Sequence, residues 1–565
     1  MKSLLGSPST VTTDVLIIGG GGAGCEAAIF AQKAGAQSTC VVEKGVIGAS
    51  GCTVMGTYSC CAALGFADPR DNPQVHFEDT DAGGARIGDP ELMRIYAEEA
   101  PARVLELADW GVPFEKEGGK LKQAHMEGHT YPRAVFADMR TGQAMQWGLR
   151  RKLKKTPRIQ RFNDVQVYRL LVADGRVFGA VGLSRKTLTP IRFLAKATII
   201  ATGGCGQLYI PNTTSLDNTG DGLSIAFEAG APLMDMEFVQ FFPMCWVYPI
   251  FPGRNRTVSS FLRYLPGCRL LNNRGEDFIS RKYPDWGKTL TRDLLSQAIF
   301  REVIEGRGSP HGGVFADVTA ASKEEIEKHL ALGNLLHTIQ TMGIDLKREP
   351  IEVSVASHFL MGGIQIDARG ASRVPGLFAG GEAVAGIHGA NRLGGNALSE
   401  ILVTGARAGE HAAQFAKNQK ESPPLFSLQT EWEDWIERLL VKPRAGTSPR
   451  SFRKPLQEMM WKQAGVIRTG KNLRVCLDEL SRLHSSFERD LGLSQGPGAY
   501  HMELAEAIET RLMLPLAKGI VVAALRREET RGAHLREDFP EAKEEWRTNL
   551  ILTRAKDEIL CQKRS

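Results

Sequence analysis

The sequence contains no hydrophobic run long enough to cross a membrane. A spanning helix needs about 20 consecutive apolar residues, and no stretch of the 565 residues approaches that length. Residues Met1–Asp14 are polar and lack both the apolar core of a secretory signal and a twin-arginine pair. We therefore expect a cytoplasmic protein with no direct membrane insertion, peripheral to a membrane at most through partner subunits.

Cysteine motifs for metal clusters are also absent. The ten cysteines include no C-x-x-C pair and no run with zinc or iron–sulfur spacing. Reduced, mostly buried thiols are therefore expected rather than a disulfide framework, and Cys60 and Cys61 are interpreted as small buried residues. His125–His129 (His-Met-Glu-Gly-His) offers possible ligands, but no third ligand is evident, so we predict loop residues and no metal site.

The chain also lacks a large excess of positive or negative charge. Lys and Arg number 70 against 64 Asp and Glu, a net charge of +6. The densest basic stretch, Arg150–Arg161, has only Phe162 beside it as a stacking residue. A solvated helix end is the simpler interpretation, and we expect no nucleic-acid partner.

Glycine, by contrast, is abundant. The 60 glycines fit a fold with many tight turns between strands and helices, and the length favours two to four domains. An apolar run at 14–18 leads directly into the glycine run Gly19–Gly24. The next segments, 25–34 and 39–43, predict a helix and a second strand.

The glycine run contains the pattern Gly19-x-Gly21-x-x-Gly24. Glycine permits the tight turn, the close approach to a pyrophosphate and the packing of helix on sheet, while the helix N-terminus favours the phosphates. Glu43 lies 19 residues after Gly24, where a carboxylate binds a ribose 2′-hydroxyl. The pattern predicts a dinucleotide site but leaves FAD and NAD open.

Two further strands end in glycines, at 196–204 and 376–382. Three such ends far apart in sequence suggest one sheet assembled from separated segments, with an inserted second domain between them. From about Asn418 the spacing of apolar residues becomes helical, through 432–440, 472–491 and 502–526. We see no internal repeat.

Six blocks stand out along the chain: Arg140–Gly142, Ala201–Gly204, Asn218–Gly222, Met236–Phe241, His388–Asn396 and Glu529–Pro540. In this order they resemble the succinate dehydrogenase/fumarate reductase flavoprotein family, whose superfamily includes L-aspartate oxidase and adenylylsulfate reductase. The resemblance implies an α/β fold: a Rossmann-type FAD-binding domain (1–235 and 353–415), an inserted α+β capping domain (236–352) and a C-terminal helical domain (416–565).

The same resemblance implies FAD as the cofactor. Many family members attach FAD covalently through a histidine, but the corresponding stretch Ala49–Thr53 has none, so we predict non-covalent FAD, with Cys52 an improbable substitute. The predicted cofactor contacts are Gly19, Gly21, Gly22, Ala23, Gly24, Glu43, Lys44, Ser50, Thr53, Gly56, Val167, Thr202, Gly203, Asp221, Glu382, Asn396 and Leu398.

Three residues match the family's catalytic positions. Arg392 and His358 match the residues that bind the substrate carboxylate, and Arg292 matches the proton-shuttle arginine. A guanidinium suits the first role because its planar fork pairs with a carboxylate. The shuttle role rests on the resemblance, because an arginine is an unusual acid–base group.

The chain departs from the family where a second substrate carboxylate is held. A histidine is replaced by Phe242, and a Thr-Glu pair by Ser260-Phe261. A phenylalanine cannot pair with a buried carboxylate. The hypothesis is therefore a substrate with one carboxylate and a bulkier or less polar far end, not plain succinate or fumarate.

The sequence thus predicts a flavoprotein subunit that exchanges electrons with a separate iron–sulfur protein. An L-aspartate oxidase-like enzyme is a second possibility, disfavoured by the lost histidine and Thr-Glu contacts. An adenylylsulfate reductase-like enzyme is a third, weakly disfavoured by the surviving Arg292, His358 and Arg392. A non-enzymatic electron-transfer protein is the fourth.

Overall fold

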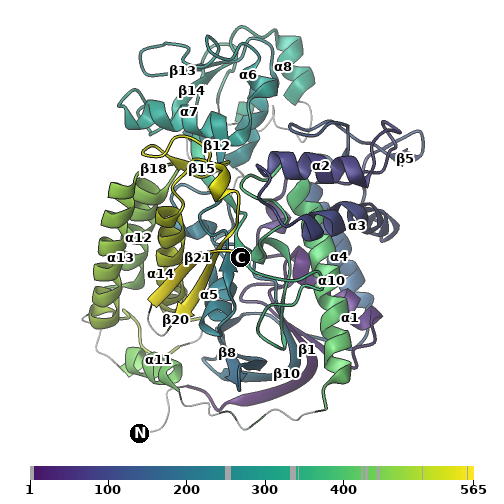
Figure 1. Ribbon diagram of the computed structural model, residues 1–565, viewed down its shortest axis with the longest axis vertical. Helices are drawn as coiled ribbons and strands as arrows, with labels where there is room; N and C mark the ends of the chain where they lie inside the picture. The colour runs from purple at the N-terminus through teal and green to yellow at the C-terminus, as the bar shows by residue number, and fades with distance from the viewer. Residues whose placement is uncertain are drawn as a thin grey trace.

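The protein is described by a computed structural model (Figure 1). The described residues are 5–248, 256–330, 339–341, 343–420, 424, 426, 430–441, 446–498, 500–555 and 558–564. Figure 1 shows a large sheet at the base, a cap of short helices at the opposite end, and a group of C-terminal helices at one side. No helix among these residues is long and apolar enough to span a membrane.

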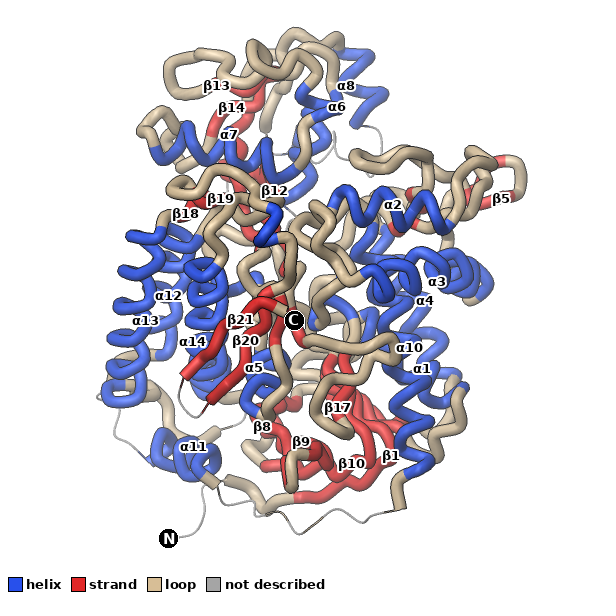
Figure 2. Tube along the Cα trace, in the orientation of Figure 1, coloured by secondary structure: helices blue, strands red, loops and turns tan. Residues whose placement is uncertain are grey.

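A seven-stranded sheet forms the base (Figure 2). Its order is β7-β2-β1-β10-β9-β8, with β17 also paired to β10. Strands β7, β2, β1, β10 and β17 are parallel, while β9 pairs antiparallel with both β10 and β8. The prediction of one sheet from separated segments is confirmed. The strands are β1 (Ser9–Ile18), β2 (Thr39–Val42), β7 (Ile159–Phe162), β8 (Val165–Ala173), β9 (Arg176–Ser184), β10 (Pro190–Ile200) and β17 (Leu377–Ala379).

Helices cover this sheet, and the closest pair is α1 and α10. A Cβ atom at Gly409 of α10 would lie 2.1 Å from the carbonyl oxygen of Ala27 in α1. Glycine therefore allows the two backbones to touch. The helices around the sheet are α1 (Gly22–Lys33), α2 (Pro73–Gly83), α3 (Pro90–Asp109), α4 (Thr141–Lys155), α5 (Asp221–Glu228) and α10 (Asn396–Asn418).

The cap is built on a four-stranded antiparallel sheet of order β12-β15-β14-β13. Strand β15 continues past residue 352, where the sequence placed a domain boundary, so this boundary falls inside a strand. The cap elements are β12 (Val239–Tyr248), η3 (Arg256–Tyr264), β13 (Arg269–Leu271), α6 (Trp286–Thr289), α7 (Arg292–Ile304), β14 (Val314–Asp317), α8 (Lys323–Leu330) and β15 (Ile351–Leu360).

The C-terminal region is mainly helical, as predicted, but it also contributes strands that the apolar spacing did not reveal. Strands β20 and β21 extend a sheet of order β16-β11-β20-β21, so the end of the chain pairs with its middle. The elements are β11 (Leu233–Met234), β16 (Gly363–Ile364), α11 (Glu431–Val441), α12 (Pro449–Ala464), β18 (Ile467–Arg468), α13 (Gly470–Asp490), α14 (Met502–Arg526), β19 (Leu535–Arg536), η6 (Glu544–Trp546), β20 (Leu550–Ala555) and β21 (Glu558–Lys563).

Short elements complete the fold. Two of them, η1 and η5, contain residues that line the central cavity. The remaining elements are η1 (Thr53–Met55), β3 (Cys60–Cys61), β4 (Lys116–Glu117), β5 (Lys120–Leu121), β6 (Ala134–Val135), η2 (Gly206–Leu208) and η5 (Gly381–Ala383).

A buried ionic network fastens the C-terminal region to the start of the cap. The Arg527 side chain is fully buried and pairs with Glu237 at 2.6 Å and Glu529 at 3.0 Å. It also donates to the carbonyl oxygens of Trp546 and Thr548, at 2.7 and 2.8 Å. The N–H groups of Arg527 therefore bind acceptors from two distant segments of the chain, at residue 237 and at residues 529–548.

We expect Arg527→Met to lower the free energy of unfolding by about 3–5 kcal/mol, because it leaves the buried carboxylate of Glu237 without the cation that pairs with it. Urea denaturation followed by tryptophan fluorescence measures the change. Arg348→Met is the matched control: the Arg348 side chain is 85% exposed, and its ion pair with Asp345 is expected to contribute at most about 1 kcal/mol. Equal effects of the two substitutions would contradict the role given to Arg527.

Candidate active site

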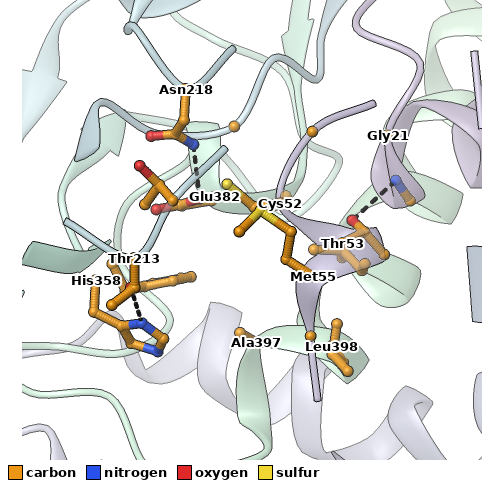
Figure 3. A pocket seen from close by; sticks show the side chains of 18 of the residues that line it. Gly21, Cys52, Thr53, Met55, Thr213, Asn218, His358, Glu382, Ala397 and Leu398 are labelled. Carbon is orange, nitrogen blue, oxygen red and sulfur yellow. Dashed lines mark hydrogen bonds between the residues drawn. The ribbon is translucent and has the colours of Figure 1, made fainter. Parts of the chain in front are cut away.

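A cavity of about 1050 Å³ lies beyond the carboxyl ends of the parallel strands β1, β10 and β17 and reaches the cap. Ligands of α/β sheets bind at this edge. Figure 3 shows Gly21 and Thr53 on one side of the cavity and Thr213 and His358 on the other. The wall therefore combines a glycine-rich turn with polar side chains from distant segments.

The turn after β1 is possible only with glycine at two positions. Gly19 has a φ of +108°, and a Cβ atom there would lie 2.2 Å from the carbonyl oxygen of Ala201. A Cβ atom at Gly24 would lie 1.8 Å from the carbonyl oxygen of Gly19. The N-terminus of α1 is thereby held against the cavity, where its dipole favours an anion.

Glu43, at the end of β2, lies in the wall near this turn. Its carboxylate accepts hydrogen bonds from the backbone N–H groups of Gly20 at 2.6 Å and Gly45 at 3.1 Å. Burial raises the pKa of Glu43, and the two N–H donors oppose that rise. The carboxylate is fixed in place and retains lone pairs for a hydroxyl group of a ligand.

Lys44 and Asp221 form a second polar part of the wall. The Lys44 ammonium group contacts Asp221 at 2.9 Å, Glu509 at 2.9 Å and the Thr219 hydroxyl at 2.6 Å. Because Glu509 belongs to α14, the C-terminal region holds a cavity residue in position.

Glu382, in η5 after β17, connects the two ends of the cavity. It accepts from the Leu360 N–H at 3.1 Å and from the Asn218 amide at 3.4 Å (Figure 3). Burial raises its pKa to about 7. Beside it, the buried hydroxyl of Thr202 has no hydrogen-bond partner among the described residues. The glycine turn, the two carboxylates and this unpaired hydroxyl fit a dinucleotide with a polar ring system, as in FAD.

Arg392 lies at the opposite end, near the cap, and is 5% exposed. Its guanidinium donates to Gln240 Oε1 at 3.0 Å and to the Leu393 carbonyl at 3.2 Å, and it stacks on the Phe359 ring at 4.6 Å. Burial first, and then the nearby positive charge of Arg292, lower the pKa of Arg392 to about 9. It is therefore still a cation at neutral pH.

His358 lies beside Arg392, on β15. Its Nδ1 is 2.7 Å from the Thr213 hydroxyl, which is a shorter contact than the 3.3 Å from that hydroxyl to the Ser357 carbonyl. Burial, Arg392 and Arg292 hold the pKa of His358 well below its ordinary value, so the ring is neutral. If the hydroxyl donates to Nδ1, the ring proton is on Nε2, where it is available to an acceptor.

Arg292 enters the cavity from the cap, at the first residue of α7. Its guanidinium stacks on the Phe242 ring at 4.7 Å, and its Nη1 is buried with no partner among the described residues. Burial lowers the pKa of Arg292, and the charge of Glu127 opposes this. Two guanidiniums and an imidazole thus meet in one cavity.

An aromatic wall faces these groups. The Phe242 ring is 4.7 Å from the His358 ring, and the Phe261 ring is 5.3 Å from that of Tyr58. Ser260 and Tyr264 line the cavity beside them. The two phenylalanines that the sequence placed at the far carboxylate position therefore lie in the cavity with Arg292 and His358.

Most residues predicted to contact the cofactor line the cavity, and so do Arg292, His358 and Arg392. Three do not: Gly24 lies behind the turn, the Ser50 hydroxyl accepts from the Val46 N–H at 2.8 Å, and Asn396 bonds to His76 and Thr80. The individual roles stay predictions. The lining residues are Gly19, Gly21, Gly22, Ala23, Glu43, Lys44, Thr53, Gly56, Val167, Thr202, Gly203, Asp221, Glu382 and Leu398.

Several residues of the site were not singled out from the sequence. Gln240 and Asn218 lie inside family-like blocks, so a signal for them existed. Thr213 has no local motif. Glu127 was considered only within His125–His129 as a metal ligand, and among the described residues no group of three or more His, Cys, Asp or Glu side chains is arranged to hold a metal.

Comparisons with known proteins agree with this geometry. A family described as FAD binding domain matches residues 14–398, and one described as Fumarate reductase flavoprotein C-term matches residues 453–563. The cofactor of this cavity is therefore FAD.

Three relatives are similar over nearly the whole chain. A fumarate reductase (CoM/CoB) subunit of Methanothermobacter marburgensis is 40% identical, covering 96% of this chain and 97% of its own. The structure of Mycobacterium smegmatis Sdh1 in complex with UQ1 has a TM-score of 0.89 at 34% identity, covering 98% and 94%. A quinol-fumarate reductase with menaquinol molecules has a TM-score of 0.87 at 30% identity, covering 99% and 98%.

We expect denaturation with trichloroacetic acid to leave a colourless pellet and a yellow supernatant, because the stretch Ala49–Thr53 has no histidine to form a covalent link with FAD. Cys52 lines the cavity, but burial raises the pKa of its thiol to about 12, so the thiolate that would attack a flavin is scarce. The measurement is flavin absorbance in the two fractions. A yellow pellet that becomes colourless in Cys52→Ala would contradict the prediction.

Proposed function

We propose that this chain, which belongs to the succinate dehydrogenase/fumarate reductase flavoprotein family, is the catalytic flavoprotein subunit of an oxidoreductase. Its substrate is a carboxylate with an adjacent carbon–carbon bond. Bound FAD supplies the hydride donor or acceptor at its N5 atom. The residues of this chain bind the carboxylate, orient the reacting carbons and move the proton.

The observation that carries this proposal is the convergence of Arg292, Arg392 and His358 on one buried cavity. The two guanidiniums repel each other, since Arg292 lowers the pKa of Arg392. Bringing an anion between them relieves this repulsion. A carboxylate fits best because it matches the planar donors of a guanidinium and accepts a third hydrogen bond from an imidazole N–H.

The three residues divide two tasks, carboxylate binding and proton transfer. Arg392, held by Gln240, and neutral His358, oriented by Thr213, bind the carboxylate. Arg292 gives or takes the proton at the carbon next to the one that exchanges the hydride. Burial supports this role because it lowers the pKa of Arg292 toward the range in which an acid is useful.

The aromatic wall supports a substrate with an apolar far end. Phe242 and Phe261 offer rings where a second carboxylate would need donors, and they lie close to Arg292 and Tyr58 respectively. A buried carboxylate without a partner costs several kcal/mol. Two of the three relatives described above are fumarate reductases by name, so it is the aromatic wall that supports a different far end of the substrate for this chain.

A separate iron–sulfur protein is proposed as the electron partner. The cysteine spacing of this chain has no cluster-ligand motif, and relatives from Methanothermobacter marburgensis and Mycobacterium tuberculosis are each named as one subunit of a fumarate reductase. Iron–sulfur clusters are held by cysteine thiolates, so clusters that exchange electrons with this flavin would belong to a separate protein.

The substrate proposal predicts that anaerobically photoreduced enzyme is re-oxidised at least about 100-fold faster by the unsaturated monocarboxylates crotonate and cinnamate than by fumarate. This ratio corresponds to a penalty of about 3 kcal/mol for burying the second carboxylate of fumarate without a partner. Flavin absorbance in a stopped-flow instrument measures the rates. Fumarate rates equal to or above those of the monocarboxylates would overturn the proposal.

An engineered pocket gives the matched comparison. The double variant Phe242→His and Phe261→Glu restores polar groups at the far end, and its rate with fumarate should rise at least tenfold. Phe66→His, which changes a half-exposed ring outside the cavity, is the control and should not alter the preference.

The partner proposal predicts that affinity-tagged chain purified anaerobically from its native host carries a second protein with non-haem iron and acid-labile sulfide. Electron paramagnetic resonance of the dithionite-reduced sample should show iron–sulfur clusters, and substrate should re-oxidise them only when FAD is present. Chain that isolates alone, without iron, and turns over at the full rate with a natural soluble donor would contradict this.

A further inference from the structure

Glu127 brings a carboxylate into the cavity from outside the cap. It lies in the loop between β5 and β6 and lines the cavity, and its side chain is 18% exposed. Its Oε1 accepts a hydrogen bond from the Tyr264 hydroxyl and lies 3.5 Å from Nη1 of Arg263. Both partners belong to η3, so this loop is joined to the cap at the cavity wall.

Arg263 is a fixed positive charge beside the start of α7. Its side chain is 4% exposed, and it donates to the carbonyl oxygens of Gly287 at 2.7 Å and Leu290 at 2.6 Å, at the end of α6. Arg292 begins α7 two residues later. The positive charges of Arg263 and Arg292 repel each other, and Arg292 therefore lowers the pKa of Arg263.

The environment of Arg292 contains more positive than negative charge. Of the groups that face it, Glu127 is the carboxylate that favours its cationic form, and it also favours that of Arg263. The ionisable groups that face Arg292 from loop 122–133, from the cap and from the sheet side are Glu127, Arg263, Cys245, His358, Arg392 and Cys61.

We propose that Glu127 is a positioning residue for the reaction: its carboxylate offsets the positive charge of Arg263 and Arg292, and its bonds to η3 hold Arg292 against the substrate. This inference rests on the proposed role of Arg292 in moving the proton, taken in the direction of substrate reduction, in which Arg292 donates it. It gives a task to the one acidic residue of His125–His129, a stretch that the metal hypothesis left without a function.

The sign of the expected effect follows from the charges. Burial lowers the pKa of Arg292, and Glu127 raises it. Removing the charge of Glu127 therefore lowers the pKa of Arg292 further. Because the reaction needs protonated Arg292, the loss of function at high pH begins at a lower pH.

Two variants separate charge from structure. Glu127→Gln keeps the size of the side chain and an oxygen that can accept from Tyr264, but removes the charge. Tyr264→Phe keeps the charge and removes the hydroxyl. We expect Glu127→Gln to move the alkaline limb of the kcat/KM profile about one pH unit lower, Tyr264→Phe to leave the limb in place, and Glu127→Asp to restore most of the shift.

A measurement that needs no turnover distinguishes this inference from the proposed function. The visible spectrum of bound FAD is titrated from pH 6 to 10, without ligand and with 3-phenylpropionate. Coincident titrations of wild type and Glu127→Gln overturn the role of Glu127. If the titrations differ but no carboxylate binds to wild type, the role of Glu127 is supported and the proposed function fails.

Discussion

The repulsion between Arg292 and Arg392 is the constraint around which the site is built. The two guanidiniums come from different parts of the chain and would separate if each were free to move. Gln240 holds Arg392, and the Ser296 hydroxyl donates to the Phe241 carbonyl at 2.8 Å, which ties α7, and with it Arg292, to β12. Adjacent residues of one strand thus secure both charges, so the rim of the main sheet and the cap act as one frame for an anion.

Sequence signals for the flavin side were strong because they arise from local backbone geometry. The turn at Gly19–Gly24 needs a positive φ and contacts too close for any Cβ atom, and such demands leave glycine at fixed spacing. Buried parallel strands likewise appear as apolar runs, so the sheet and its helices were predictable. Gly24 and Asn396 show the limit of this reasoning: a family-like motif identifies the wall, but not which members face the ligand.

The substrate side depends on contacts that no local pattern records. Strand β12 has register shifts on both sides of Phe242, and these irregularities decide which side chains of the strand reach the cavity. Thr213 and Glu127 act on His358 and Arg292 across long sequence separations. The β20–β21 hairpin was unpredicted for a similar reason, since its register is set by pairing with β11 and by Asp235, which receives the Leu550 N–H at 3.0 Å.

The attachment of the chain's end to its middle also determines when the structure can be completed during biosynthesis. Glu237 and Asp235 are made early, yet Arg527 and Asn549, which neutralise or hydrogen-bond them, emerge from the ribosome only near the end of synthesis. Lys44 is likewise synthesised long before Glu509, with which it forms an ion pair. The dinucleotide site can therefore begin to form on the nascent chain, but it is completed only after translation. A chain that ends before residue 527 keeps the carboxylates of Glu237 and Asp235 in the interior without Arg527 to pair with them.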